Sequence, residues 1–270
     1  MTGGQGVVGS NPIAPTKINE RVEDVNSTLF FVANVLMKNS NLYTIVPAYN
    51  AEHTIRKVVS GLLDCGLPMQ IIVVDDGSSD ETFDVCRQFD IRILRHERNQ
   101  GKGAALRTGF RHALNEGAEL LFTLDADGQH DPGDLLKLYD ELNRQNLDIV
   151  IGSRMQNTKP MPFHRILSNV ITSRLLSWRT GQCIEDSQSG LRLMRANVLR
   201  NITLKATKFE LESELLIKAD LQNFRIGTVG VHTIYQVNGT ESRSYVDVMD
   251  VVRFISLYLK SLTWNRANRN

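Results

Sequence analysis

The chain has 270 residues, of which 41% are hydrophobic and 23% are charged, so its length suits one large globular domain or one domain with appendages. Its formal net charge of +1 excludes the general affinity for nucleic acids that a strongly basic chain has. The three cysteines lack metal-ligand spacing and indicate a reducing compartment, and no apolar run is long enough to span a membrane. With no secretory signal pattern at its start, the chain is expected to be cytoplasmic and to have no nucleic-acid partner.

Residues 1–40 differ in composition from the rest of the chain. The first fifteen are rich in glycine, proline and small side chains and show no periodicity, which predicts a disordered N-terminal extension. Met37 stands shortly before the first convincing strand, and our hypothesis is that it is the native start. The intact mass of natively expressed protein tests this hypothesis, and a mass that begins at Met1 contradicts it.

From residue 42 onward, strand patterns alternate with helix patterns. Strands are expected at 42–47, 70–74, 91–95, 120–124 and 149–151, and helices at 54–65, after the second strand, before residue 116 and at 135–144. This alternation predicts an α/β fold with a mostly parallel sheet and helices on both faces. Ligands of such sheets bind beyond the carboxyl ends of the strands, where polar motifs follow four of the expected strands.

The expected fourth strand ends in two carboxylates one residue apart, Asp125 and Asp127. In an extended chain, side chains at i and i+2 point to the same side, so these acids repel each other unless a cation lies between them. Gln129 adds a neutral oxygen, and such hard ligands suit Mg²⁺ or Mn²⁺ with phosphates completing the shell. The alternative is a strand followed by an acidic turn at Gly128. The pattern favours a metal site.

Three other motifs lie at the same predicted edge. Asp76, after the second strand, can accept hydrogen bonds from a nucleobase or a ribose hydroxyl. Lys102, between two glycines at the start of a helix, suits a phosphate, although a turn explains this loop equally well. Arg154, directly after the fifth strand, is a better phosphate candidate.

Three later stretches have helical patterns with two interpretations each. Residues 161–179 combine an apolar face with spaced arginines, which suits a helix covering the sheet or a membrane-surface helix that receives a lipid phosphate. Residues 245–264 are too polar to span a membrane and suit a helix that packs on the domain or the membrane surface. Glu210 and Glu212 open a further helix, where the helix dipole alone favours acidic residues.

Five motifs in order carry a resemblance to a known family: P-A-Y-N at 47–50, V-V-D-D-G-S-S-D-E-T at 73–82, G-K-G-A-A at 101–105, D-A-D-G-Q-H at 125–130 and G-S-R at 152–154. The set resembles the family 2 glycosyltransferases. More narrowly, D-S-Q-S-G-L-R at 186–192 is similar to the dolichyl- and polyprenyl-phosphate mannose or glucose synthases. The resemblance implies a GT-A fold, a Rossmann-like three-layer sandwich, over residues 41–235, and leaves 236–270 as a C-terminal loop and amphipathic helix.

The resemblance also implies an activity and site residues. The activity is inverting, metal-dependent transfer of a hexose from a donor such as GDP-mannose or UDP-glucose to polyprenyl phosphate, at the cytoplasmic face of a membrane. The implied donor contacts are Pro47, Tyr49, Val74, Asp76, Lys102, Asp125, Ala126, Arg154 and Arg243. Asp125, Asp127 and Gln129 would hold Mg²⁺ or Mn²⁺, and the catalytic residues would be Asp127, Arg154 and Asp186. Arg165, Glu210 and Glu212 would meet the acceptor or a phosphate.

The sequence departs from the family pattern at two places, and two alternative functions are considered. Position 51 is Ala where the family often has Glu, and the arginine that usually precedes the turn at 241–243 is absent. Transfer to a sugar hydroxyl, with Asp186 as the base, is the same-fold alternative. With a phosphate acceptor, Asp186 would instead order the pocket. A non-catalytic nucleotide-sugar-binding protein is the alternative of another class.

Overall fold

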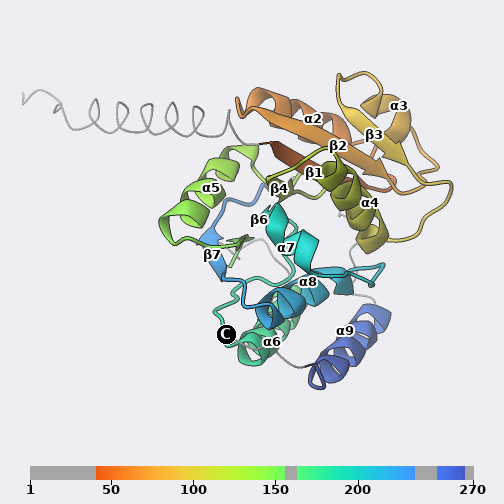
Figure 1. Cartoon of the computed structure of the whole chain (residues 1–270). Coiled ribbons are helices and arrows are strands. Elements are labelled where there is room, and N and C mark those ends of the chain that lie inside the picture. The colour runs from red at the N-terminus through yellow and green to blue at the C-terminus, as the bar shows by residue number, and fades with distance from the viewer. Residues whose placement is uncertain (1–40, 156–162, 235–247, 265–270) are drawn as a thin grey trace, which may run out of the picture.

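The computed structural model describes residues 41–155, 163–234 and 248–264. Its centre is a seven-stranded sheet in the order β3-β2-β1-β4-β6-β5-β7 (Figure 1). The strands are β1 (Leu42–Ala48), β2 (Met69–Asp75), β3 (Arg92–Arg95), β4 (Leu120–Thr123), β5 (Ile149–Ser153), β6 (Arg192–Arg195) and β7 (Ile226–Gly230). Only β6 runs antiparallel to its neighbours, β4 and β5, so the predicted mostly parallel sheet is confirmed.

Helices cover both faces of this sheet. They are α2 (Ile55–Asp64), α3 (Thr82–Cys86), α4 (Lys102–Asn115), η1 (Pro132–Asp134), α5 (Leu135–Arg144), α6 (Phe163–Thr180), α7 (Ala196–Asn201), α8 (Glu210–Leu221) and α9 (Val248–Ser261). One hydrophobic core joins α2, α3 and α5 to the sheet, and the other joins α4, α7 and α8 to the opposite face. The predicted extension at residues 1–40 and the loop that contains Arg243 lie outside the described residues.

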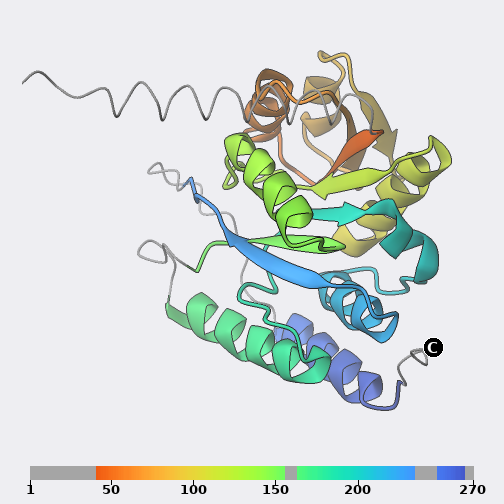
Figure 2. The ribbon, with the colours of Figure 1, turned by 60° about the vertical axis from the view of Figure 1, so that its left-hand side comes forward.

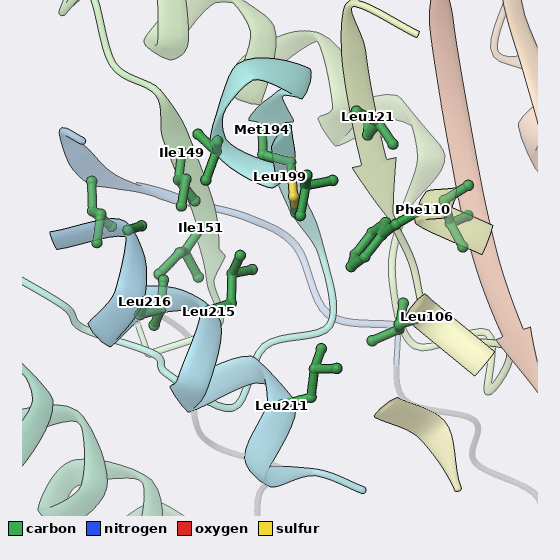
Figure 3. Close-up of a cluster of buried hydrophobic side chains, with 14 of the residues drawn as sticks. Leu106, Phe110, Leu121, Ile149, Ile151, Met194, Leu199, Leu211, Leu215 and Leu216 are labelled. Carbon is green, nitrogen blue, oxygen red and sulfur yellow. The ribbon is translucent and has the colours of Figure 1, made fainter. Parts of the chain in front are cut away.

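The two cores explain why the strands read as unbroken apolar runs. All seven residues of β1 are buried, as expected for a strand covered on both faces. Figure 3 shows the core under α8, where side chains from α4, α7 and α8 meet those of three strands. The labelled members are Leu106, Phe110, Leu121, Ile149, Ile151, Met194, Leu199, Leu211, Leu215 and Leu216. This packing fixes the carboxyl ends of β1, β2, β4 and β5 at one edge of the sheet.

Helices α6 and α9 lie side by side beyond α8, at the bottom of the molecule in both views (Figures 1 and 2). Phe254 and Tyr258 attach α9 to the core, and Arg179 of α6 donates hydrogen bonds to the carbonyl oxygens of Ser261 and Trp264. No helix in the described parts of the chain is long and apolar enough to cross a bilayer. The outer faces of α6 and α9 nevertheless expose large apolar side chains: Leu167, Ile171, Trp178, Val251, Val252, Ile255 and Leu259. Leu262, directly after α9, is exposed as well.

Candidate active site

The acidic motif after β4 lies in a turn and not in an extended chain. β4 ends at Thr123, and the chain turns over residues 126–128, with Gly128 at a φ of 72°. The strand-alternation argument for the two carboxylates is therefore wrong in its geometry. The electrostatic expectation holds, because the Asp125 carboxylate still acts on Asp127. Together with burial, it raises the pKa of Asp127 to about 6.

Lys102 joins two acids that are distant in sequence. Its Nζ lies 2.7 Å from Oδ1 of Asp125 and 2.9 Å from Oε1 of Glu212. Burial alone would lower the pKa of Lys102, but these two carboxylates outweigh it and raise that pKa. Lys102 in turn holds the pKa of Asp125 below its usual value despite burial. The start of α4, the turn after β4 and the start of α8 thus meet in one buried charge cluster.

The residues after β4 fit a divalent cation of the hard type. Among the described residues, no three His, Cys, Asp or Glu side chains are grouped as a ready-made metal site. The donor set is instead two carboxylates, Asp125 and Asp127, with the Gln129 amide nearby in sequence. Mg²⁺ and Mn²⁺ are typically held by one or two carboxylates while substrate phosphates complete the shell. The raised pKa of Asp127 is the signature of a carboxylate that a cation would stabilise.

A second ion pair follows β5. The Asp186 carboxylate, fully buried, accepts hydrogen bonds from Arg154 Nε (2.9 Å), Nη2 (3.0 Å) and backbone N (3.0 Å). It also accepts one from Asn169 Nδ2 of α6 at 2.7 Å. Burial would raise the pKa of Asp186, but the bonds from Arg154 lower it. This carboxylate is buried and accepts three of its four hydrogen bonds from Arg154, so in this arrangement it fixes the orientation of the Arg154 guanidinium.

The loop 186–192 is held against α8 by Arg192, which is buried. Its guanidinium donates to the carbonyl oxygens of Ser187, Ser189 and Glu212. Within this loop, Gly190 faces Asp125, and a Cβ there would lie 2.2 Å from Asp125 Oδ2. The glycine of the D-S-Q-S-G-L-R motif is therefore what lets the backbone approach the acidic turn.

The predicted nucleoside contacts divide into exposed and buried positions. Tyr49 is 49% exposed at the end of β1 and is open to a base. Asp76 is buried and accepts hydrogen bonds from His96 Nδ1 and from two backbone N–H groups of the loop before α4, so it fixes the position of that loop. The side chain of Val74 is wholly buried in the core against α4, because both faces of β2 are covered.

The remaining predicted residues are placed as follows. Pro47 is buried beside Val74 in the sheet, and the Ala126 carbonyl accepts a hydrogen bond from Thr54. Glu210 begins α8, and its Oε2 is buried with no partner among the described residues. Arg165 belongs to α6, but its side chain, like all of Arg243, is outside the described part.

His130 is a buried residue of the site that the sequence argument did not single out. It closes the D-A-D-G-Q-H motif and is 3% exposed. Burial lowers its pKa to about 4, with Asp125, Arg154 and Lys102 the strongest charges acting on it. Its place in the motif was a signal, but the sequence could not show that the ring is buried.

Comparison with known proteins identifies the family of this chain. The sequence profile named Glycosyl transferase family 2 matches residues 43–202. The protein belongs to glycosyl transferase family 2. It is 34% identical over 221 residues to the UDP-N-acetylglucosamine–dolichyl-phosphate N-acetylglucosaminyltransferase of Methanococcus voltae, covering 74% of this chain and 88% of that protein. It is also 30% identical to the undecaprenyl-phosphate mannosyltransferase of Micrococcus luteus over 60% of this chain and 70% of that protein.

Solved structures confirm the fold of this family 2 enzyme. A glucosyl-3-phosphoglycerate synthase of Mycobacterium tuberculosis, crystallised with Mn²⁺, UDP-glucose and phosphoglyceric acid, matches with a TM-score of 0.65. The match has 20% identity and covers 85% of this chain and 82% of that one. At this identity the likeness establishes the GT-A fold and nothing finer. The protein is a glycosyltransferase, and the non-catalytic alternative is set aside.

Proposed function

We propose that this glycosyltransferase moves a hexose from a nucleotide sugar to polyprenyl phosphate with inversion at the anomeric carbon. The observation that carries the proposal is the double role of α6. Its inner face fixes the Arg154–Asp186 pair through Asn169, and its outer face exposes Leu167 and Trp178. One helix thus joins a cationic site to an apolar surface, which are the two features that a lipid phosphate needs.

The protein's relatives support the same acceptor. The Methanococcus and Micrococcus proteins are named for transfer to dolichyl phosphate and undecaprenyl phosphate, respectively. The two names differ in the donor sugar and agree in the class of lipid. We therefore propose the lipid-phosphate class for this chain and leave the sugar to experiment.

A phosphate acceptor needs no general base, and Asp186, the candidate base for a hydroxyl acceptor, is buried and hydrogen-bonded. A phosphate oxygen is already anionic near neutral pH, so it can attack the anomeric carbon without losing a proton. The bond between that carbon and the diphosphate breaks, and its electron pair leaves with the nucleoside diphosphate. The guanidinium of Arg154, oriented by Asp186, would stabilise the charge on the departing diphosphate. A sugar hydroxyl would need a base, and Asp186 is buried and fully hydrogen-bonded.

We further propose that Asp125, Asp127 and Gln129 hold Mg²⁺ or Mn²⁺ when the donor is bound. The ion would neutralise the diphosphate oxygens as a Lewis acid. Lys102 would contribute positive charge beside Asp125, and Tyr49 would pack against the base. The apolar outer faces of α6 and α9 support peripheral contact with a membrane, which we propose is its cytoplasmic face. We also propose that Arg165 meets the acceptor phosphate.

The test is a transfer assay with two matched acceptors. Labelled UDP-N-acetylglucosamine, UDP-glucose and GDP-mannose are each incubated with Mn²⁺ and either polyprenyl phosphate or the corresponding free polyprenol. We expect label in the lipid phase with the phosphate and none with the alcohol. No label in the lipid phase with polyprenyl phosphate, for a donor that the protein binds, would contradict the proposal. A thermal-shift screen of the same nucleotide sugars identifies the donor beforehand, because a ligand that binds only the native state raises its melting temperature.

A further inference from the structure

Phe209 is a large aromatic side chain at the rim of the buried charge cluster. It stands directly before α8 and is 51% exposed. The Nζ atom of Lys102 lies over its ring, 5.6 Å from the ring centroid. The same Nζ pairs with Asp125 and Glu212, so the ring borders the place where the acidic turn, α4 and α8 meet. An aromatic residue beside the groups that would hold a donor is therefore accessible to a ligand.

The segment that leads into Phe209 is fixed by contacts on two sides. Oε2 of Glu214 accepts hydrogen bonds from two backbone N–H groups of this segment, at 2.9 and 2.8 Å. The Thr207 carbonyl oxygen accepts a 2.9 Å hydrogen bond from a backbone N–H in the first turn of α4. A Cβ on Gly103 would lie 2.6 Å from the carbonyl oxygen of Lys208, so glycine permits this close approach. The backbone that carries the ring is thus in place before a ligand binds, which lowers the entropic cost of binding.

The order of the strands indicates which part of the donor would meet the ring. In the proposed function, the nucleoside lies at the ends of β1 and β2, with Tyr49 beside the base, and the diphosphate lies at the turn after β4. From β4 the sheet continues to β6 and β5, and α8 packs against these two strands (Figure 3). A donor that runs from β1 across the turn after β4 therefore places its hexose toward the start of α8, where Phe209 lies.

The chemistry at this position suits a hexose. A pyranose has an apolar face of C–H groups and an edge of hydroxyls. An aromatic ring offers a flat apolar surface with an electron-rich face that attracts C–H hydrogens and repels an anionic phosphate. The carboxylates of Asp125 and Glu212 nearby can accept hydrogen bonds from hydroxyls. A polyprenyl chain has no hydroxyl to offer them, and the apolar outer faces of α6 and α9 suit it better.

We infer that Phe209 is the stacking platform for the hexose that the enzyme transfers. The inference rests on the proposed function for its nucleotide-sugar donor, and it does not depend on the acceptor. The sequence argument did not single out Phe209 as a donor contact. The ring would contribute to binding of the sugar and not to binding of the nucleoside diphosphate.

The experiment measures the ratio of the affinity for a nucleotide sugar to the affinity for its nucleoside diphosphate. Calorimetry with Mn²⁺ uses UDP-N-acetylglucosamine with UDP, or GDP-mannose with GDP, whichever pair wild type binds. Phe209→Leu keeps an apolar cover over Lys102 and removes the flat ring. We expect it to lower the ratio roughly three- to tenfold, the scale of an aromatic stacking contact, and to leave the affinity for the diphosphate unchanged.

Three further variants sharpen the test. Phe209→Met also lacks a ring and should lower the ratio in the same way, whereas Phe209→Tyr retains the ring and should keep the wild-type ratio. Phe89→Leu is the matched control, because its ring lies 5.8 Å from the guanidinium of Arg56 and packs on the opposite face of the sheet. It should change neither affinity. Melting temperatures without ligand show whether each variant is folded.

Three results would overturn the inference. With an unchanged ratio in Phe209→Leu and Phe209→Met, the ring only covers the charge cluster. An equal loss of both affinities would assign the ring to the nucleoside or the diphosphate. An unchanged ratio with a raised KM for polyprenyl phosphate would assign it to the acceptor.

The same measurements separate this inference from the proposed function. Calorimetry needs no acceptor, so a lowered ratio in Phe209→Leu supports the hexose platform even if polyprenyl phosphate receives no label. That combination overturns the proposed acceptor alone. Wild-type protein that binds no nucleotide sugar overturns the proposed function and the inference together.

Discussion

Replacement of Asp186 by Asn separates an orienting carboxylate from a catalytic base. The substitution keeps the shape of the side chain and removes its charge. In the folded protein, this carboxylate is fully buried and accepts three hydrogen bonds from Arg154 and one from Asn169. An amide offers one acceptor oxygen and turns an NH₂ group toward donors, so some of these bonds must break.

The structure sets the size of the effect. Removing one partner of a buried ion pair typically costs about 3–5 kcal/mol, because the other charge stays buried. In a domain of this size each kcal/mol lowers the melting temperature by roughly 2–4 °C, so Asp186→Asn should lower it by roughly 6–20 °C. Transfer should fall because Arg154 is no longer oriented toward the diphosphate, and the affinity for the nucleoside diphosphate should fall with it. Differential scanning fluorimetry and calorimetry measure the two effects.

A double variant provides the control. Arg154→Met combined with Asp186→Leu removes both charges, so it should be more stable than Asp186→Asn while staying inactive. A base would behave differently. If Asp186→Asn abolishes transfer while the melting temperature and the diphosphate affinity stay at wild-type values, the orienting role is refuted and a hydroxyl acceptor becomes the better interpretation.

Three further predictions concern the metal, the buried lysine and the lipid surface. Asp127→Asn should keep the fold and lose most of the turnover. Folding raises the pKa of Asp127 to about 6, so the stability that its protonated form provides is lost as the pH rises through 6. Between pH 5 and 7.5 the melting temperature of metal-free wild type should therefore fall more than that of Asp127→Asn. Equal pH profiles of the two proteins would contradict this prediction. Lys102→Met leaves two buried carboxylates unpaired and should cost about 3–5 kcal/mol in chemical denaturation, more than Glu212→Gln, and the reverse order would be inconsistent with the charge cluster. Ile171→Asp should weaken co-sedimentation with anionic lipid vesicles, whereas Leu63→Asp, at an equally exposed position on α2, should not; equal binding by both variants would exclude α6 as the contact surface.

Much of the fold was predictable because the strands are buried on both faces. Continuous apolar runs gave β1, β2 and β4 almost to the residue, and α5 was predicted at its observed bounds, 135–144. The strands β6 and β7 were not expected. The sequence of β6 is R-L-M-R and that of β7 is I-G-T-V-G, and neither has an apolar run or a clear alternation. Their pairing is decided by tertiary contacts, which also reverse the direction of β6.

The sequence predicted at which edge of the sheet the site lies, but it did not predict which side chains form ion pairs there. Topology alone brings the ends of β1, β2, β4 and β5 together, which is why the candidate residues gather there. Spacing in sequence does not show that Lys102 meets Glu212, 110 positions away, or that Arg154 is held by Asp186.

The charges of the site argue that donor and cation bind together. Lys102 is paired with Asp125 and Glu212, and Arg154 is paired with Asp186. With Asp127 beside Asp125, these groups comprise four carboxylates and two cationic side chains. An anionic diphosphate entering this site alone would meet net negative charge in a poorly solvated environment, where repulsion is strong. A divalent cation at the acidic turn would offset that excess and leave both cationic side chains for the phosphates. In the proposed reaction the cation is therefore a condition for holding the donor, and not only a means of stabilising the leaving group.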